Sequence, residues 1–366
     1  MNQPAGGSSD PGDAAGATEP APGWLPCSDR SLERDDPLPG TAGYGERWFL
    51  VEIDGAWGAH AFLQSPLDPA LGRALVTRIE SAGIRPLAIR RTGRTAHERR
   101  AQASWRWAAV DARPGHEQIR WGAVSDPAEL LTVPLDGAGG EASTEPLICV
   151  CTHARHDQCC AVRGRPVVTA LAQAHPDATW ECSHLGGDRF AATLILFPHG
   201  LYYGRMSAEE APALIDRYRA GLIEPGRFRG RSSLPNVVQA AAAFAAREFG
   251  DDRVDAFAYR SWTESAGVHS VHFDHTPVGQ TTVGQTTVGQ TTVGQKLVGQ
   301  SPIDHSTAPA VQPVTVGVVE TLSEPLLSTC AATTARPVRQ FRLHSIDRSA
   351  PAPEPPVEPP VEPLVE

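Results

Sequence analysis

The chain has 366 residues, enough for two compact domains that each bury a core of their own. Its formal net charge of −10 disfavours a general nucleic-acid binder, which needs basic side chains to replace the counterions of phosphates. No run approaches the roughly eighteen apolar residues of a membrane span, and no charged segment followed by an apolar one opens the chain. We therefore expect a cytoplasmic protein that binds neither nucleic acid nor membrane.

Three segments have a composition that does not support a packed core. Residues 1–23 consist mainly of Gly, Ala, Pro, Ser and Asp and are expected to be disordered. Residues 347–366 are rich in Pro and Glu, which predicts an extended acidic tail. Residues 276–300 hold five pentapeptides of the type TTVGQ, a period too short for a solenoid. We interpret this repeat as a loop within a small C-terminal sheet.

The first half of the remaining chain predicts alternating strands and helices. An aromatic and β-branched run predicts a strand over residues 47–55. Apolar residues spaced four apart, ended by a glycine, predict a helix over residues 67–83. Two further strands are predicted over residues 84–91 and 104–111. A short helix with an Asp near its start is predicted over residues 126–133.

The second half repeats this order. The apolar run PLICVCT predicts a strand over residues 146–152, and the pattern that follows predicts a helix over residues 161–174. The other elements predicted for this half are strands over residues 179–184, 190–197 and 201–206 and a helix that begins after Ser207.

This repeated order is typical of a thioredoxin-like unit, in which helices flank a mixed sheet. We therefore expect an α/β fold with two tandem thioredoxin-like units, a small C-terminal β extension and disordered ends. The expected boundaries are residues 24–140 for a first unit without clustered Cys, residues 141–226 for a second unit with them, and residues 227–346 for a helix and the small β extension.

The second unit holds the residues that indicate chemistry, because four of the seven cysteines crowd into one of its segments. In a reducing compartment such crowding indicates metal or redox chemistry rather than disulfides. Cys151 ends a predicted strand, and one of Cys159 or Cys160 returns at the start of the next helix, where N–H groups favour an anionic cluster. Residues two apart on a strand face the same side, so Cys182 and His184 are both expected to face this loop.

Other candidate residues have simpler interpretations. Cys149 lies among apolar neighbours and is interpreted as a core thiol. Cys27 and Cys330 are isolated in the sequence and are interpreted as structural or surface thiols. Arg229 and Arg231 are candidates for anion binding, although helix capping by the serines that follow them explains the segment as well.

Several long stretches match a known family. They are CTHARHDQCCAVRGRPV, WECSHLGGDRFAATLILFPHGLYYGRM and FRGRSSLPNVVQAA, together with CSDR, GTAGYGERWFLVEIDGAWG and the late LLSTCAA. In these stretches the sequence resembles the sucrase/ferredoxin-like family, whose thioredoxin-like ferredoxin domain binds a [2Fe–2S] cluster. The resemblance covers residues 24–275 and 311–346. No pair of acidic residues arranged for glycoside hydrolysis supports the word sucrase in the family's name.

The resemblance implies a Cys-x8-Cys ligand pair, which falls on Cys151 and Cys160. In fungal relatives a His-x3-His pair supplies the other ligands; here the first position is His184, but the second is Asp188. A carboxylate oxygen is a hard ligand and matches an iron–sulfide core poorly. The expected ligands are Cys151, Cys160, Cys182 and His184, with Cys159 and Asp188 as alternates.

A [2Fe–2S] cluster implies electron transfer with a redox partner protein. Whether the chain is an enzyme stays open, because it fits a carrier or a redox module of an oxidoreductase. One alternative is a thiol–disulfide oxidoreductase, although the helix-opening Cys-x-x-Cys motif that lowers a thiol's pKa is missing. Another is a structural zinc module, although the Cys-x8-Cys spacing is longer than zinc sites usually show.

Overall fold

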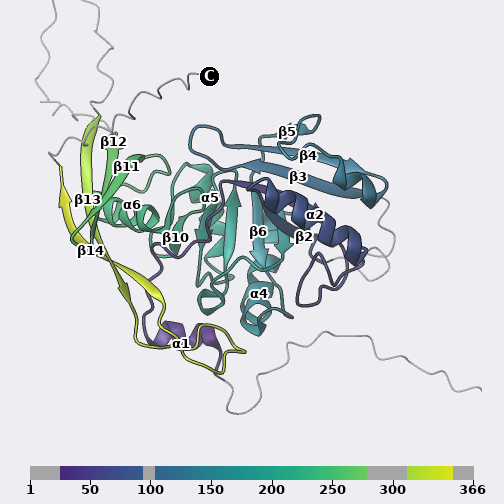
Figure 1. Cartoon of the computed structure of the whole chain (residues 1–366), viewed down its shortest axis with the longest axis horizontal. Helices are drawn as coiled ribbons and strands as arrows, with labels where there is room; N and C mark the ends of the chain where they lie inside the picture. The colour runs from purple at the N-terminus through teal and green to yellow at the C-terminus, as the bar shows by residue number, and fades with distance from the viewer. Residues whose placement is uncertain (1–24, 94–103, 278–310, 349–366) are drawn as a thin grey trace, which may run out of the picture.

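The computed structural model describes residues 25–93, 104–277 and 311–348 (Figure 1). The expected disordered segment 1–23 and nearly all of the expected tail 347–366 and repeat 276–300 lie outside these residues. Among the described helices, none has the length and apolar character needed to cross a bilayer.

The described helices are α1 (Cys27–Glu33), α2 (Pro69–Ser81), α4 (Gln158–Ala174), α5 (Ala211–Arg219) and α6 (Asn236–Phe249), with the short 3₁₀ helices η1 (Pro127–Leu131) and η2 (Asp188–Phe190). The strands of the first half are β1 (Arg47–Glu52), β2 (Arg85–Arg90), β3 (Trp105–Asp111), β4 (Gln118–Val124) and β5 (Glu141–Ser143). Those of the second half are β6 (Leu147–Cys151), β7 (Thr179–Cys182), β8 (Leu194–Phe197), β9 (Leu201–Tyr203) and β10 (Phe228–Arg231). The C-terminal strands are β11 (Phe257–Ser265), β12 (Val268–His275), β13 (Gln312–Leu322) and β14 (Arg339–Asp347).

Ten of the described strands form one mixed sheet in the order β10-β9-β8-β6-β7-β2-β1-β3-β4-β5. In each half a helix connects two parallel strands: α2 joins β1 to β2, and α4 joins β6 to β7. Antiparallel strands extend each half outward, β3 and β4 beyond β1, and β8 and β9 beyond β6. The halves meet where β2 pairs antiparallel with β7, with Ile89 opposite Cys182.

The expected α/β fold, with a large mixed sheet, flanking helices and a smaller C-terminal sheet, is thus confirmed. Both halves of the large sheet have the same strand order and directions, as a tandem arrangement requires. The thioredoxin-like assignment of each half and the boundaries between the expected domains stay predictions.

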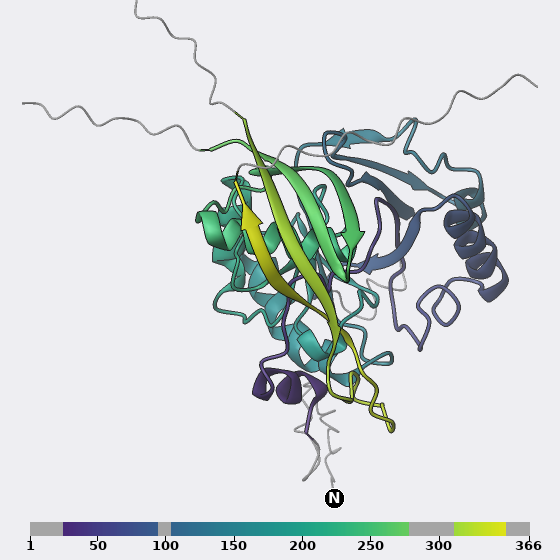
Figure 2. The ribbon, with the colours of Figure 1, turned by 60° about the vertical axis from the view of Figure 1, so that its left-hand side comes forward.

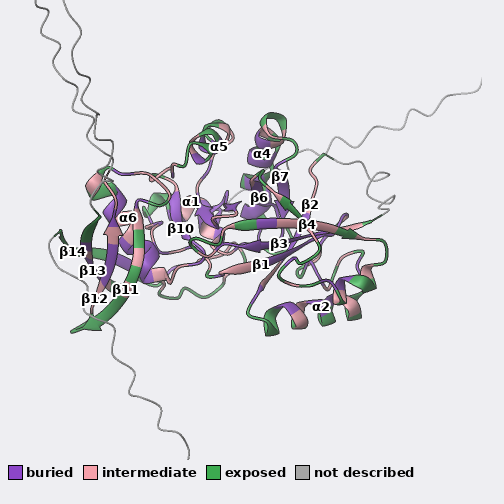
Figure 3. Ribbon diagram, turned by 90° about the horizontal axis from the view of Figure 1, so that it is seen from above, coloured by how far each residue is buried: buried purple, intermediate pink, exposed green. Residues whose placement is uncertain are grey.

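The two halves of the large sheet face each other across a shared core. Trp48 of β1 packs against Phe197 of β8 with ring centroids 5.4 Å apart, and Trp121 of β4 stacks on Trp180 of β7 at the same separation. Figure 3 shows α2 on one side of these strands and α4 and α5 on the other. The helices therefore cover the outer faces of the two halves.

Strand β6 alternates between these two environments, as a strand with both faces buried must. Ile148 and Val150 pack in the core beneath α4 and α5. Cys149 and Cys151 point into the shared core, which also contains Cys182 from β7. The sheet thus carries three cysteines into the space between its halves.

The four C-terminal strands form an antiparallel sheet in the order β11-β12-β13-β14, and α6 packs on it through valines and alanines. The long connection from β13 to β14 leaves this sheet and runs to α1, which Figures 1 and 2 show beside each other. The segment around Cys330 therefore lies beside the segment around Cys27, although the two are far apart in the chain.

Helix α4 begins at Gln158 rather than at the expected residue 161. The reason is local, because the Asp157 carboxylate accepts the N–H of Cys159 at 2.8 Å and caps the helix. Cys159 and Cys160 consequently both lie in the first turn of α4, at the helix start where one of them was expected.

Strand β7 ends at Cys182 rather than at the expected residue 184. The N–H of His184 donates to the ring of His153 at 3.3 Å and so leaves the sheet's hydrogen-bond ladder. The expectation that Cys182 and His184 share one strand face was therefore wrong.

Other differences are smaller. Helix α1 and strands β4, β5 and β10 are not among the elements predicted from the sequence. The strand expected over residues 190–197 is divided into η2 and β8, and the helix expected over residues 126–133 is the 3₁₀ helix η1.

Candidate metal centre

Cys151, Cys160 and His184 come together at the end of β6. Their ligand atoms, two sulfurs and one ring nitrogen, all lie within 4.8 Å of one another. The approach of α4 to β6 depends on Gly164, where a Cβ atom would lie 2.2 Å from the backbone oxygen of Cys151. The end of β6, the start of α4 and the loop after β7 thus each contribute one donor atom.

Asp188 completes this group, which we call the inner group: Cys151, Cys160, His184 and Asp188. Its Oδ1 atom lies 3.1 Å from the Cys160 sulfur and 3.1 Å from Nδ1 of His184. The two sulfurs and the carboxylate are buried, whereas 26% of the His184 side chain is exposed. The imidazole is therefore the part of the group nearest to solvent.

The loop that carries His184 and Asp188 turns back sharply. Gly186 and Gly187 have φ of +89° and +81°, a backbone conformation that residues with a side chain rarely adopt. At Gly187 a Cβ atom would also lie 2.3 Å from the guanidinium of Arg229. This glycine pair lets the chain place both ligands within one short segment.

The charges of the inner group reinforce one another. The adjacent Cys160 thiol and the His184 imidazole hold the pKa of Cys151 well below its usual range, against the opposing effect of burial. Burial acts to lower the pKa of His184, but the Asp188 carboxylate and the Cys151 thiolate raise it to about 9. Burial acts to raise the pKa of Asp188, but the imidazole outweighs it and lowers that pKa. The group therefore favours a thiolate and a carboxylate, the forms in which these side chains bind metal, whereas the His184 imidazole has to lose its proton to become a ligand.

Two further histidines surround His184. The ring of His153 donates from Nε2 to the Gly58 carbonyl at 2.6 Å and accepts the His184 N–H at Nδ1, which fixes a neutral tautomer. Burial lowers the pKa of His153, consistent with that neutral form. The ring of His156 stacks on His184 with centroids 3.6 Å apart. His153 therefore positions the backbone of His184, and His156 covers its ring.

The two arginines expected to be candidates for anion binding are engaged within the protein. Arg229 is buried and donates to the Gly186 carbonyl at 3.0 Å and to the Thr41 carbonyl at 2.5 Å. Arg231 is paired with Glu117 and donates to Asp255. Arg229 therefore braces the glycine loop instead of offering its charge to a ligand.

The other expected ligands lie elsewhere. Cys182 is opposite Cys151 in the register of β6 and β7, and burial and the Cys149 thiol raise its pKa. It is absent from the groups of possible metal ligands found among the described residues. Cys159 belongs to a second group, with Cys27 and Cys330.

Sequence reasoning treated Cys27 and Cys330 as isolated, although a signal was present. Each lies in a short stretch, CSDR and LLSTCAA, that resembles the same family as the central cysteine segment. Shared family likeness at three distant places is a sign that they meet in the fold.

The donors of the inner group fit an iron–sulfur cluster. Two thiols and an imidazole are the ligand types that iron–sulfide cores prefer. Nδ1 of His184 is buried and finds no hydrogen-bond partner in the described structure, despite its short distance to Asp188. The protonated His184 imidazole offsets the charge of the buried Asp188 carboxylate here, and a metal ion would take over that role once the imidazole loses its proton.

Comparison with known proteins agrees with the resemblance found in the sequence. The sucrase/ferredoxin-like family matches residues 38–230, and the chain belongs to this family. No curated protein and no solved structure matches the chain. The matched region includes the whole inner group but excludes Cys27 and Cys330.

Proposed function

We propose that this protein binds a [2Fe–2S] cluster through the inner group and serves in electron transfer. The observation that carries the proposal is the convergence of two buried thiols and an imidazole within 4.8 Å of one another, with the Asp188 carboxylate 3.1 Å from the Cys160 sulfur and 3.1 Å from the His184 ring. Three of these residues stand where the family resemblance expects ligands. The bound cluster would supply one-electron reduction and oxidation, which none of the side chains offers alone.

Asp188 is the fourth ligand in this proposal, in place of Cys182. The carboxylate touches both Cys160 and His184, whereas the Cys182 thiol lies beside Cys149 in the shared core. Asp188 also occupies the position of the second His in the fungal His-x3-His pair. Position in the motif and contact in the fold therefore favour the same residue.

The ligand types set the expected reduction potential. Neutral imidazoles raise the potential, because two His ligands in Rieske centres give about −150 to +300 mV, against about −400 mV for all-Cys plant-type ferredoxins. A set with one His and one carboxylate keeps more negative charge than a Cys₂His₂ set. We therefore expect a potential between these two classes.

A thiol–disulfide oxidoreductase is less well supported. Cys151 and Cys160 are each only 1% exposed, so an incoming protein disulfide has no access to either sulfur. In thiol–disulfide exchange, His184 and Asp188 would also have no role. Electron exchange with a partner protein, by contrast, needs only a route to the surface, which the partly exposed His184 and the exposed His156 provide.

The first test is to purify the full chain without oxygen, count iron and sulfide, and record visible and EPR spectra. We expect two irons and two sulfides per chain, as the formula of the cluster requires, and a rhombic EPR signal after reduction. Cys151→Ser should abolish the colour. Asp188→Ala should alter the EPR signal, whereas the matched control Cys182→Ser, on the neighbouring strand, should leave it unchanged.

Other outcomes would be decisive against parts of this proposal. A wild-type chain that stays colourless after anaerobic reconstitution with iron and sulfide excludes the cluster. A signal that changes in Cys182→Ser but not in Asp188→Ala retains the cluster and replaces the fourth ligand.

A further inference from the structure

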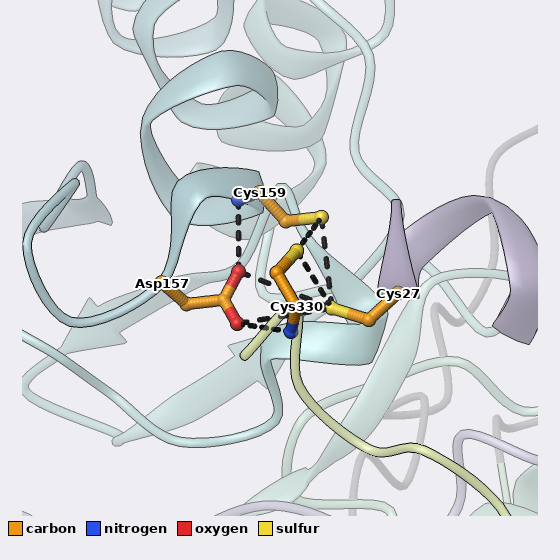
Figure 4. A group of neighbouring side chains, drawn as sticks. All are labelled: Cys27, Asp157, Cys159 and Cys330. Carbon is orange, nitrogen blue, oxygen red and sulfur yellow. Dashed lines mark hydrogen bonds between the residues drawn. The ribbon is translucent and has the colours of Figure 1, made fainter. Parts of the chain in front are cut away.

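A second group of thiols meets at the start of α4. It includes Cys159, the residue next to Cys160. Figure 4 shows Cys27 from α1, Cys330 from the connection between β13 and β14, and Asp157 and Cys159 from the start of α4. We call these four residues the outer group. Their possible ligand atoms all lie within 4.8 Å of one another.

The sulfur–sulfur distances in the outer group are compatible with three thiolates bound to one ion. Cys27 and Cys159 are 3.6 Å apart, Cys27 and Cys330 3.5 Å, and Cys159 and Cys330 3.0 Å. All three distances exceed the roughly 2.0 Å of a disulfide bond. The two distances to Cys27 approach the value of about 3.8 Å that follows from Zn–S bonds of about 2.3 Å at tetrahedral angles, and the Cys159–Cys330 distance is shorter. A disulfide between two of them would in addition leave the third thiol unused.

Asp157 supplies a fourth donor that is already oriented. One carboxylate oxygen accepts the N–H of Cys159 at 2.8 Å, and the other accepts the N–H of Cys330 at 2.7 Å. Both oxygens lie 3.9 Å from the Cys27 sulfur and keep a lone pair for a metal. The carboxylate is buried, and within the described ranges no basic side chain forms an ion pair with it. A cation would offset the cost of burying this charge.

The outer group joins parts of the chain that are far apart in the sequence. Cys27 and Cys159 are 132 residues apart, and Cys159 and Cys330 are 171 residues apart. Linking such distant positions restricts the unfolded chain strongly, which is how cross-links stabilise a fold. Here the link attaches α1 and the long connection of the C-terminal sheet to the helix start that presents Cys160.

We propose that the outer group is a structural zinc site, with Cys27, Cys159 and Cys330 as thiolate ligands and Asp157 as the fourth ligand. Three thiolates and one carboxylate form a closed tetrahedral set, which suits a structural ion and leaves no position for substrate. Each thiol releases its proton when the ion binds. The site is independent of the iron proposed for the inner group, with which it shares no ligand.

The test is to express the full chain in medium that contains zinc and to count zinc and iron in wild type, Cys330→Ser and the control Cys149→Ser. Cys330 is the least buried of the three thiols, and Cys149 is a core thiol outside both groups. We expect one equivalent of zinc to be lost in Cys330→Ser, with the iron content and visible spectrum unchanged. Cys149→Ser should keep the zinc. Equal zinc in wild type and Cys330→Ser overturns the proposal, as does wild-type protein that takes up no zinc.

A second measurement on wild-type protein does not depend on how a variant folds. X-ray absorption at the zinc edge should find three sulfurs at about 2.3 Å and one oxygen at about 2.0 Å. Mass spectrometry of the alkylated protein should find all three thiols free once zinc is removed under denaturing conditions. A different first shell, or a disulfide among these cysteines in protein purified with reductant, overturns the proposal.

Discussion

Cys159 and Cys160 are neighbours in one helical turn, yet their sulfurs belong to two different groups. The inner group takes its residues from a short part of the chain, positions 151 to 188, around one strand–helix–strand unit. The outer group takes one residue from near each end of the described chain and two from its middle. One group is thus local to a folding unit, and the other links units.

The two groups also differ in chemistry. The inner group combines thiols with an imidazole that is partly exposed, which suits electron exchange with a partner. The outer group has three thiols and a carboxylate that also caps α4, which suits a closed structural site. Side chains on adjacent residues of a helix point about 100° apart, so one turn can serve both sites.

The largest effect we expect is a reciprocal loss of metal in two single variants. Cys160→Ser should lose the iron and keep the zinc, and Cys159→Ser should lose the zinc and keep the iron, because each sulfur belongs to only one of the two groups of possible ligands. Metal analysis of both variants, prepared identically under anaerobic conditions, measures this directly. Loss of both metals from either variant would contradict the separation of the groups.

The sequence predicted the local group far better than the distant one. Cys151, Cys160 and His184 lie within one predicted strand–helix–strand pattern, so the pattern and the family likeness were sufficient to propose them as one group. The choice between Cys182 and Asp188 depended on where β7 ends, which is set by the hydrogen bond from His184 to a histidine ring. The residues around Cys182 give little indication, by their pattern alone, of where β7 ends.

The residue pattern alone could not predict the distant group, and only the family likeness of CSDR and LLSTCAA pointed to it. Cys27 and Cys330 meet because the connection from β13 to β14 crosses to α1, a tertiary arrangement that no hydrophobic period records. The same limit applies to the large sheet. A mixed sheet flanked by helices was predicted, but the strands β4, β5 and β10, the pairing of β2 with β7 and the core between the halves were not.

A smaller, graded effect concerns the reduction potential of the inner group. Asp188→His would replace the proposed anionic ligand by a neutral one and introduce the His-x3-His pattern that the resemblance implies for fungal relatives. The potential should rise, by about 100 mV or more in view of the difference between Rieske and plant-type centres. Redox titration followed by EPR measures the shift.

The matched control for this variant is Asp177→His, which makes the same charge change at an exposed position of the same half. We expect its potential to stay within a few tens of millivolts of wild type, because surface charges are screened. An unchanged potential in Asp188→His would exclude Asp188 as a ligand and leave the inner group with three.

The smallest effect we expect concerns the packing of α4 against β6, which should affect the inner group but not the outer group. Replacing a glycine inside a helix by alanine normally raises the free energy of unfolding by roughly 0.5–1 kcal/mol. At Gly164 the added Cβ would lie 2.2 Å from the backbone oxygen of Cys151, so α4 and β6 must move apart. Gly164→Ala should therefore lower the free energy of unfolding by about 1–3 kcal/mol, the usual cost of overpacking.

Gly164→Ala should also lower the iron content, because the distance between Cys151 and Cys160 depends on that contact, while zinc in the outer group is retained. Gly226→Ala is the control, since its Cβ would meet only the Glu224 carboxylate at an ordinary 3.5 Å. Urea denaturation and metal analysis of the two variants test both effects, and a stabilised, fully iron-loaded Gly164→Ala would show that this glycine does not set the spacing of the inner group.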